Sequence, residues 1–428
     1  MIPFGEVDRR TMWLRITLLN ACFFGMIACA PLWTNVHAFP LLPIVSGFPV
    51  MPHPWDQVLF GAMLLSLVAA AWFYRMAVRF FLVTALFAYC EDENRGQPWL
   101  YMYWVMLVLS LFPAKTAIAA CRWGMSAVYI WSGIQKCNAN FFRDEPAEFL
   151  APAIHWHLPA FALQLMRWTV ACTPFIEMGI GLALWSPRFR RAAIVAAIIV
   201  HAGALLFLGP FGSNYNLVVW PWNLAMPALL WVLFAKGAYW EQPAGEPAAT
   251  AAAKPDNKGA KAKASLRDDK KISAPDASLG QTFMELQRSK PALVLVALYS
   301  LLPILSFSGL WDSYFSFSLY SKNLASANVF ITQEFADRLP ARMKAQVQKF
   351  PQAFDTQHQG PLVFNFGAWG YEELHVPPIA EPRNFVSVFK ALRAWSKEPT
   401  DLHMIVGQRA GPVIFYEGDF REFLTPVN

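Results

Sequence analysis

The sequence carries little charge for its length, and this scarcity argues against a water-soluble domain. Only 15% of the 428 residues are charged, whereas 56% are hydrophobic and 15% are aromatic. Soluble domains usually carry about 25% charged residues. The deficit predicts an integral membrane protein whose main partner is the lipid bilayer. Because the net charge of +6 is modest and no basic cluster carries aromatic stacking partners, we expect no nucleic-acid partner.

Paired cysteines and catalytic signatures are also missing. The six cysteines stand apart from one another, and none follows Cys172. Such spacing lacks the close pairs of a thioredoxin-like or zinc motif. His201 is alone in its hydrophobic stretch, without a second histidine at matching depth, so we predict neither metal nor heme. The segment after residue 310 has no Gly-rich phosphate loop and no Ser-His-Asp pattern, so it does not reveal an activity.

What the chain has instead is a series of hydrophobic windows long enough to cross a ~30 Å hydrocarbon core. The nine windows are 12–31, 56–74, 76–90, 97–113, 116–135, 161–185, 189–209, 218–236 and 291–310. Lys and Arg gather in alternate connections, as the positive-inside rule requires. This pattern predicts nine spans, with the N-terminus in the cytoplasm and the C-terminus outside.

The predicted fold is an all-α polytopic membrane bundle of about nine transmembrane helices with a small C-terminal extracytoplasmic α+β domain. Residues 1–236 supply helices one to eight and residues 290–310 supply the ninth. Residues 237–289 are rich in Ala, Lys, Pro and Asp, which predicts a disordered cytoplasmic linker. In residues 311–428, "ANVFITQEF", "PLVFNFGAW", "DLHMIVG" and "PVIFYEG" read as strands, and "PRNFVSVFKALRAWSKE" reads as an amphipathic helix.

A polar stripe runs along the fifth window. Arg122, Ser126, Tyr129, Gly133 and Lys136 are spaced three or four residues apart, which places them on one helical face. At 1.5 Å per residue the stripe extends roughly 21 Å, most of the bilayer core. Polar groups in hydrocarbon are costly and usually face a partner or a cavity.

Glu177, in the sixth window, is a candidate partner for the polar residues of this stripe. It follows Thr169 and Thr173 at intervals of four residues, and it lies in the inner half of the membrane, as Arg122 does. We therefore predict an intramembrane ion pair between Arg122 and Glu177. The pair has two interpretations, one in which it only fixes packing and one in which it transfers protons.

Lys136 ends the stripe in "YIWSGIQKCNANFF", at the outer edge of its window. It is either an interfacial anchor or a partly buried base, because burial disfavours the ammonium form and leaves an amine able to take a proton. The outer loop that follows places His155 and His157 on either side of Trp156. These histidines are candidate proton relays, with interfacial anchoring as the alternative.

The segment 129–142, with the outer loop after it, resembles the HTTM domain of the vitamin K-dependent gamma-carboxylase-like proteins and the broader DoxX-like layout. "VVWPWN" and "WGYEELHVPPIAEPRNF" resemble segments of a bacterial branch. The resemblance implies nine spans in a bacterial inner membrane, a quinone-like ligand and Lys136 as the base that deprotonates it. The segment after residue 310 is much shorter than the carboxylase's outer region, so protein carboxylation does not carry over.

The sequence is consistent with three functions. The first is a quinol-using membrane enzyme or redox-associated protein, with Lys136 as base, His155 or His157 as relay, and a pocket wall of Tyr129, Trp131, Gln135 and Asn138. The second is a non-catalytic scaffold that binds a protein partner through residues 311–428. A transporter is the third, and the lack of an internal repeat argues against it.

Overall fold

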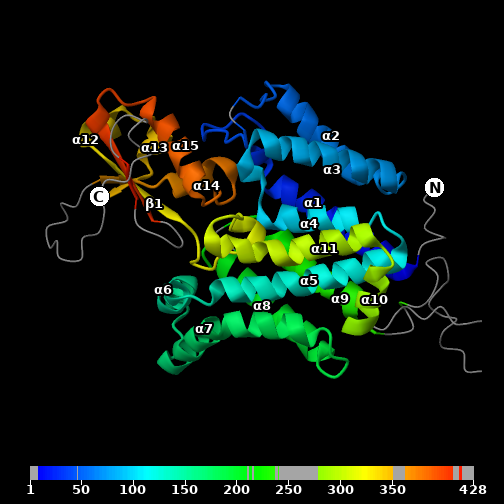
Figure 1. Ribbon diagram of the computed structural model, residues 1–428. Coiled ribbons are helices and arrows are strands. Elements are labelled where there is room, and N and C mark those ends of the chain that lie inside the picture. Colours follow the sequence, from blue (N-terminus) through cyan, green and yellow to red (C-terminus); the bar gives the residue numbers. More distant parts are fainter. Residues whose placement is uncertain are drawn as a thin grey trace, which may run out of the picture.

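The computed structural model describes residues 8–45, 47–209, 212–214, 216–236, 240, 278–349, 362–407 and 414–416. In this part of the chain, long helices lie side by side and a small sheet sits at one end of the bundle (Figure 1). The first helix begins at the opposite end. The bundle and the sheet follow the division between a helical region and a C-terminal α+β segment that the sequence predicts.

Each of the nine hydrophobic windows contains a helix within the described residues. These helices are α1 (Arg9–Ala28), α2 (Trp55–Ala69), α3 (Tyr74–Glu91), α4 (Pro98–Leu109), α5 (Ala114–Lys136), α7 (Ala160–Ala183), α8 (Arg190–Leu208), α9 (Val219–Phe234) and α11 (Lys290–Leu301). The 3₁₀ segment η7 (Leu302–Ser308) extends α11. Uncharged apolar runs form helices in a membrane because an intrahelical ladder satisfies their backbone groups without water.

Three helical segments in the described part of the chain are long and apolar enough to cross a membrane by length and composition. They are α1, α8 and the continuous segment Lys290–Ser308. The apolar helices α2, α4 and α9 are shorter, with 15, 12 and 16 residues. The structure therefore shows a helical bundle suited to a membrane, and the count of nine spans stays a prediction.

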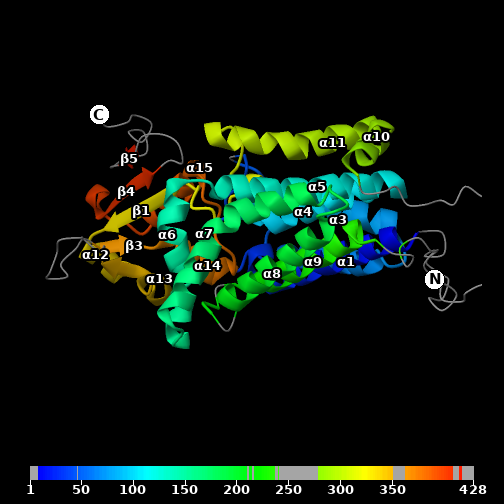
Figure 2. The ribbon, with the colours of Figure 1, turned by 90° about the horizontal axis from the view of Figure 1, so that it is seen from below.

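Two short helices flank the bundle. Helix α6 (Ala139–Phe149) runs across the end of the bundle that carries the sheet (Figure 2). Helix α10 (Leu279–Gln287) lies at the other end and packs on α5, with Leu286 buried and Thr116 donating a hydrogen bond to Glu285 at 3.2 Å. The end of the predicted disordered linker is thus an ordered part of the bundle, because α10 has an apolar face to bury. Apart from Trp240, residues 237–277 lie outside the described part of the chain.

The sheet is antiparallel and has the strand order β2-β3-β1-β4-β5. Its strands are β1 (Ser326–Ile331), β2 (Val347–Lys349), β3 (Leu362–Phe364), β4 (Leu402–Gly407) and β5 (Ile414–Tyr416). The helices of this segment are α12 (Gln333–Arg338), α13 (Ala341–Lys344), α14 (Phe366–Leu374) and α15 (Pro382–Arg393). In β4, Leu402, Met404 and Val406 alternate inward and are buried, as a half-covered strand requires.

The four predicted strands and the amphipathic helix are present, with three differences. The first predicted strand ends at Ile331, because Thr332 caps α12 and "QEF" is helical. The second predicted strand ends at Phe364, because Asn365 caps α14 and turns "FGAW" into helix. The strand β2 was not predicted, since its three residues continue the polar pattern of the helical segment before it. Short edge strands carry too little pattern to be recognised.

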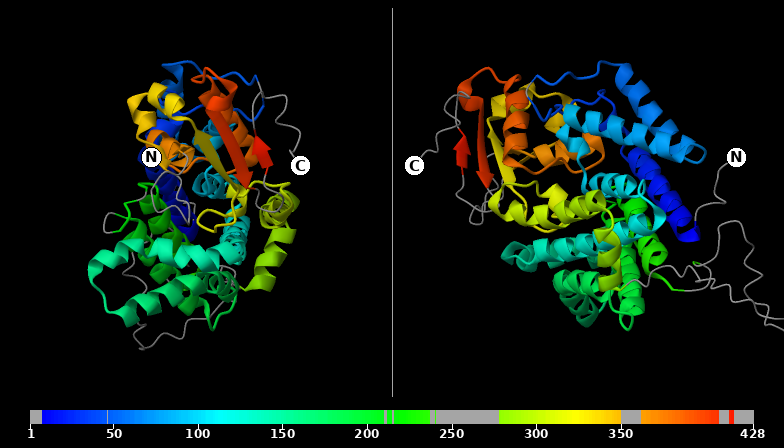
Figure 3. Two further views of the ribbon diagram at one scale, coloured as in Figure 1. Left: turned by 90° about the vertical axis from the view of Figure 1, so that its left-hand side faces the viewer. Right: turned by 45° about the vertical axis from the view of Figure 1, so that its right-hand side comes forward.

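The sheet segment docks on the loops of the first four helices, and it shares one end of the bundle with α6 and α7 (Figure 3). Phe39 packs against Trp369 with ring centroids 4.9 Å apart. Arg383 of α15 forms an ion pair with Glu93 at 2.7 Å and another with Asp312 at 2.7 Å. These contacts fix the α+β segment against the bundle.

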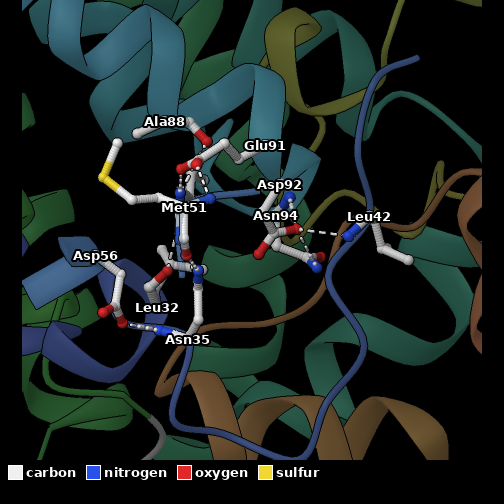
Figure 4. A network of polar contacts seen from close by, with 10 residues as sticks. Leu32, Asn35, Leu42, Met51, Asp56, Ala88, Glu91, Asp92 and Asn94 are labelled. Atoms are coloured by element: carbon white, nitrogen blue, oxygen red, sulfur yellow. Dashed lines mark hydrogen bonds and ion pairs between the residues drawn. The ribbon is translucent and has the colours of Figure 1, made fainter. Parts of the chain in front are cut away.

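A buried polar network stabilises the same loops (Figure 4). Arg95, in the connection between α3 and α4, is only 1% exposed. Its guanidinium donates to the Leu32 carbonyl at 3.0 Å, to Glu91 at 2.9 Å and to Asn35 at 2.9 Å. Asp92 accepts from the backbone N–H of Leu42 at 3.3 Å. The buried guanidinium of Arg95 therefore holds these loops together, and Arg95 does not lie at the protein surface.

Helices α5 and α7 approach closely through two glycines. A Cβ atom at Gly133 would lie 2.4 Å from the carbonyl oxygen of Pro174, and one at Gly181 would lie 2.9 Å from that of Ser126. Small residues let transmembrane helices pack backbone to backbone. The contact sets the register of the two helices and brings their polar residues together.

Candidate functional site in the helix bundle

A cavity of about 480 Å³ lies among α5, α7, α8 and α9, near the end of the bundle that carries the sheet. Its wall is mostly apolar. The polar residues of the wall are Gln97, Tyr129, Ser132, Lys136, Glu145, Thr169, Thr173, Glu177, His201, Asn216, Tyr320 and Asn223. Volume and wall chemistry suit a small amphipathic molecule, because ligand sites combine apolar surface with few convergent polar groups.

The first polar feature of the cavity is an ion pair between α5 and α7. Nζ of Lys136 lies 2.8 Å from Oε2 of Glu177, and it donates to Oγ of Ser132 at 2.6 Å. Lys136 is 7% and Glu177 is 9% exposed. A charged group in a low-dielectric site needs an opposite charge and further hydrogen bonds, and this arrangement supplies both.

The second polar feature joins α5, α8 and α9. The Tyr129 hydroxyl lies 2.7 Å from Nε2 of His201, and Nδ1 of His201 lies 2.7 Å from Oδ1 of Asn223. The amide of Asn223 donates to the Val219 carbonyl at 2.8 Å, so its oxygen faces the histidine. A neutral His201 therefore carries its proton on Nδ1 and accepts at Nε2 from Tyr129.

The sheet end of the cavity is covered by α6 and by the segment 317–322. Phe317, Tyr320 and Lys322 all adopt positive φ angles, of 59°, 61° and 55°. Lys322 forms ion pairs with Glu148 and, at 3.7 Å, with the cavity residue Glu145. Burial raises the pKa of the Glu145 carboxyl above its usual range. This segment closes the cavity at its polar rim.

The predicted site residues separate into two groups. Tyr129 and Lys136 line the cavity, whereas Trp131, Gln135 and Asn138 do not. Trp131 donates to the Ser300 carbonyl at 2.8 Å and Gln135 donates to Ser306 at 3.1 Å, so both bind α11 and η7. Asn138 caps α6 by accepting from the Phe141 N–H at 2.9 Å. They do not form the wall of this cavity, because Trp131 and Gln135 lie on a different face of α5 from Lys136, and Asn138 lies beyond the end of α5.

His155 and His157 also lie outside the cavity wall. Both are exposed, on or directly after the 3₁₀ segment η4 (Ala151–Trp156). The structure does not bring them to Lys136, and the histidine of the cavity is His201. The sequence identified His201 as an isolated intramembrane histidine but gave no sign that α8 and α9 would pair it with Tyr129 and Asn223.

The predicted ion pair between Arg122 and Glu177 is wrong, since Glu177 pairs with Lys136. Arg122 is buried, and its Nε donates to the Leu233 carbonyl of α9 at 2.7 Å. Arg122 and Lys136 are separated by roughly 21 Å along α5. The helix register set at Gly133 and Gly181 places Glu177 beside Lys136, at the end of the stripe opposite Arg122.

The polar stripe therefore has two parts. In the part farther from the sheet, Ser126 donates to the Gly181 carbonyl at 2.6 Å and accepts from Trp185 at 2.8 Å, which holds α7 in place. In the part nearer the sheet, Tyr129 and Lys136 line the cavity. Among the described residues, no group of three or more His, Cys, Asp or Glu side chains is placed to hold a metal ion.

Together, the apolar helices of the bundle and its mostly apolar cavity define a helical membrane protein. Residues 114–218 match the family model described as methylamine utilisation protein MauE, a membrane family. The match covers less than half of the chain and includes α5, α6, α7 and α8, which carry Lys136, Glu177 and His201. No curated protein and no solved structure matches the chain.

The match overturns the expected resemblance to the HTTM, gamma-carboxylase-like and DoxX-like proteins. That resemblance relied on an aromatic helix with small residues and a terminal lysine. The structure gives these features local causes, since Gly133 packs against α7 and Lys136 pairs with Glu177. Such causes arise in any closely packed membrane bundle, so the pattern was not specific to one family.

Proposed function

We propose that the protein binds a lipid-soluble molecule with a hydrogen-bonding head group, such as a quinone or quinol, and exchanges a proton with it. The observation that carries this proposal is that the Lys136–Glu177 pair and the Tyr129–His201 pair line one cavity with an otherwise mostly apolar wall. Ionisable groups within a membrane are costly, and they usually mark ligand sites or proton paths.

The chemistry of a quinone head group fits both polar features. Its carbonyl oxygens accept hydrogen bonds from an ammonium or a hydroxyl group, and the reduced form returns hydroxyl donors. Lys136 and Tyr129 are seven residues apart on one face of α5, so both face the same ligand. The apolar remainder of the wall accommodates the hydrocarbon part of the molecule.

The ion pair changes the role proposed for Lys136. Nζ of Lys136 is 2.8 Å from the Glu177 carboxylate, so we assign Lys136 as a hydrogen-bond donor to the ligand and not as a free amine base. Glu177 is then the group that accepts a proton from a bound quinol. The match of residues 114–218 to a membrane family supports this cavity as the functional part, because those residues supply most of its wall.

The proposal is tested by titrating the protein in lipid nanodiscs with decylubiquinone and following tryptophan fluorescence. Trp99 and Trp222 line the cavity, so a bound quinone quenches them. The double variant Lys136→Met/Glu177→Leu removes both charges together and leaves no unpaired ion in the fold. Because hydrogen bonds to charged groups contribute about 1.5–3 kcal/mol, we expect binding to weaken roughly 10- to 100-fold.

The matched control is Arg143→Met/Asp144→Leu, which removes an ion pair on α6 whose arginine side chain is 70% exposed. This control should bind as the wild type does. The proposal fails if the wild type shows no saturable quenching, or if both double variants bind with wild-type affinity.

A further inference from the structure

The wall of the cavity is buried on one side and exposed on the other. On α5 and α9, the lining residues Tyr129 and Met226 are 3% and 2% exposed. On α7 and α8, Thr169 is exposed and Ile199 is 65% exposed, although both line the same cavity. A residue that lines a cavity and also reaches the outer surface marks an opening. The cavity therefore opens sideways, between α7 and α8.

The surface around this opening is apolar. Leu165 and Trp168 of α7 are 64% and 62% exposed, and Ile198 and Leu206 of α8 are 43% and 42% exposed. Helix α8 is one of the segments that are long and apolar enough to cross a membrane. An opening with this rim is suited to contact with hydrocarbon, since exposed apolar area of this extent is unfavourable in water.

The sheet end of the cavity is closed by packed side chains. Phe207 of α8 stacks on Trp156 with ring centroids 5.1 Å apart and contacts Phe149 at the end of α6. The segment 317–322 adds Phe317 and Tyr320 to the wall, and the ion pairs of Lys322 hold this segment on α6. A ligand that entered from water at this end would have to separate both contacts.

We infer that ligands enter the cavity from the bilayer through a lateral portal between α7 and α8, and that the apolar chain of the ligand remains in this portal. The portal comprises Thr169, Ile199 and Gly203. The ligand is then an amphiphile with a long apolar chain, whose head group lies against Lys136 and Tyr129. This inference rests on the proposed function, and it adds the route and the class of molecule.

Gly203 offers a direct test of the portal. It lines the cavity, and a Cβ atom there would meet no atom within 4 Å, so the backbone at this position leaves room for a side chain to extend into the portal. Gly179 is a matched control on α7, since it is also helical and open to a Cβ atom but does not line the cavity. The variants are Gly203→Leu and Gly179→Leu, and both should fold because leucine favours helix more than glycine.

The experiment measures stopped-flow quenching in nanodiscs with two probes, decylubiquinone and the same quinone ring without its chain. We expect Gly203→Leu to slow the association of both probes, decylubiquinone at least tenfold and the chainless ring less, because only decylubiquinone places an apolar chain in the portal. Gly179→Leu should change neither rate. A third variant, Lys322→Ala, loosens the closure at the sheet end and should not accelerate decylubiquinone.

Three outcomes overturn the portal. The first is unchanged decylubiquinone association in Gly203→Leu. The second is an equal loss for both probes, which indicates a filled binding site. The third is faster association in Lys322→Ala, which indicates entry from water. If the wild type binds neither probe, the proposed function fails as well, and this result is distinct from the other three.

Discussion

At the scale of single residues, the Lys136–Glu177 pair is the feature that most clearly separates a binding cavity from a packed interior. Both side chains are largely buried, yet both line the cavity in addition to contacting one another. The hydroxyl oxygen of Ser132, one turn before Lys136, accepts a further hydrogen bond from Nζ of Lys136. The buried charges are therefore compensated, and the fold tolerates them as long as they remain together.

The first prediction follows from this compensation. Glu177→Leu leaves the ammonium of Lys136 buried without a counter-ion, so we expect it to destabilise the protein by about 3–5 kcal/mol. Lys136→Met/Glu177→Leu should be more stable than Glu177→Leu, since the double variant has no unpaired charge. The free energy of unfolding in detergent measures both. Purely additive effects of the two single variants would contradict the pairing.

At the scale of elements, the contact between α5 and α7 decides which polar residues meet. Gly133 and Gly181 allow the two backbones to approach, and this register places Glu177 next to Lys136 instead of Arg122. The geometry of the candidate site therefore depends on the two glycines in the helix contact as well as on the residues that line the cavity.

A second prediction concerns Gly181. Its Cβ atom would lie 2.7 Å from Ile130 and 2.9 Å from the Ser126 carbonyl, so Gly181→Ala should separate the helices and cost about 1–3 kcal/mol. Gly179, two residues earlier on α7, has open space at its Cβ position. Gly179→Ala should therefore be neutral, or more stable by up to about 1 kcal/mol. Equal unfolding free energies of the two variants would show that close packing at Gly181 is not required.

At the scale of the whole molecule, successive long helices run in opposite directions along the bundle (Figure 1). The sheet docks at the end of the bundle opposite the start of α1 (Figure 1). Charge distribution in the sequence predicts that this sheet end faces outward. The turn between α7 and α8 carries Arg188, and α8 begins with Arg190 and Arg191, whereas residues 212–214 after α8 carry no charge. By the positive-inside rule, we predict that the N-terminal end of α8 lies in the cytoplasm.

A third prediction tests this orientation with cysteine labelling. In a Cys137→Ser/Cys172→Ser background, which removes the exposed thiols, Ser213→Cys and Arg188→Cys mark the two ends of α8. An impermeant maleimide should label Ser213→Cys in intact cells and Arg188→Cys only after permeabilisation. Labelling of both positions from one side would contradict a membrane-spanning α8.

Features that depend on interactions between neighbours in the sequence were predicted correctly, whereas features that depend on contacts between distant segments were not. Hydrophobic windows located each long helix, because the tendency of an apolar run to form a helix is local. The stripe of α5 was also visible from spacing alone. The partner of Glu177 was not, because it depends on the register between two helices, and the burial of Arg95 depends on loops contributed by α1, α2 and α3.

The sequence by itself determined a hydrophobic chain with helical windows, an α5 helix with one polar face and a small segment of strands and helices after residue 310. Tertiary structure decided that Lys136 is neutralised by Glu177, that His201 joins Tyr129, and that these groups share one cavity. The physical reason is that periodicity fixes the face of a helix on which a side chain lies. Packing between helices, here through the glycines of α5 and α7, fixes what that face meets.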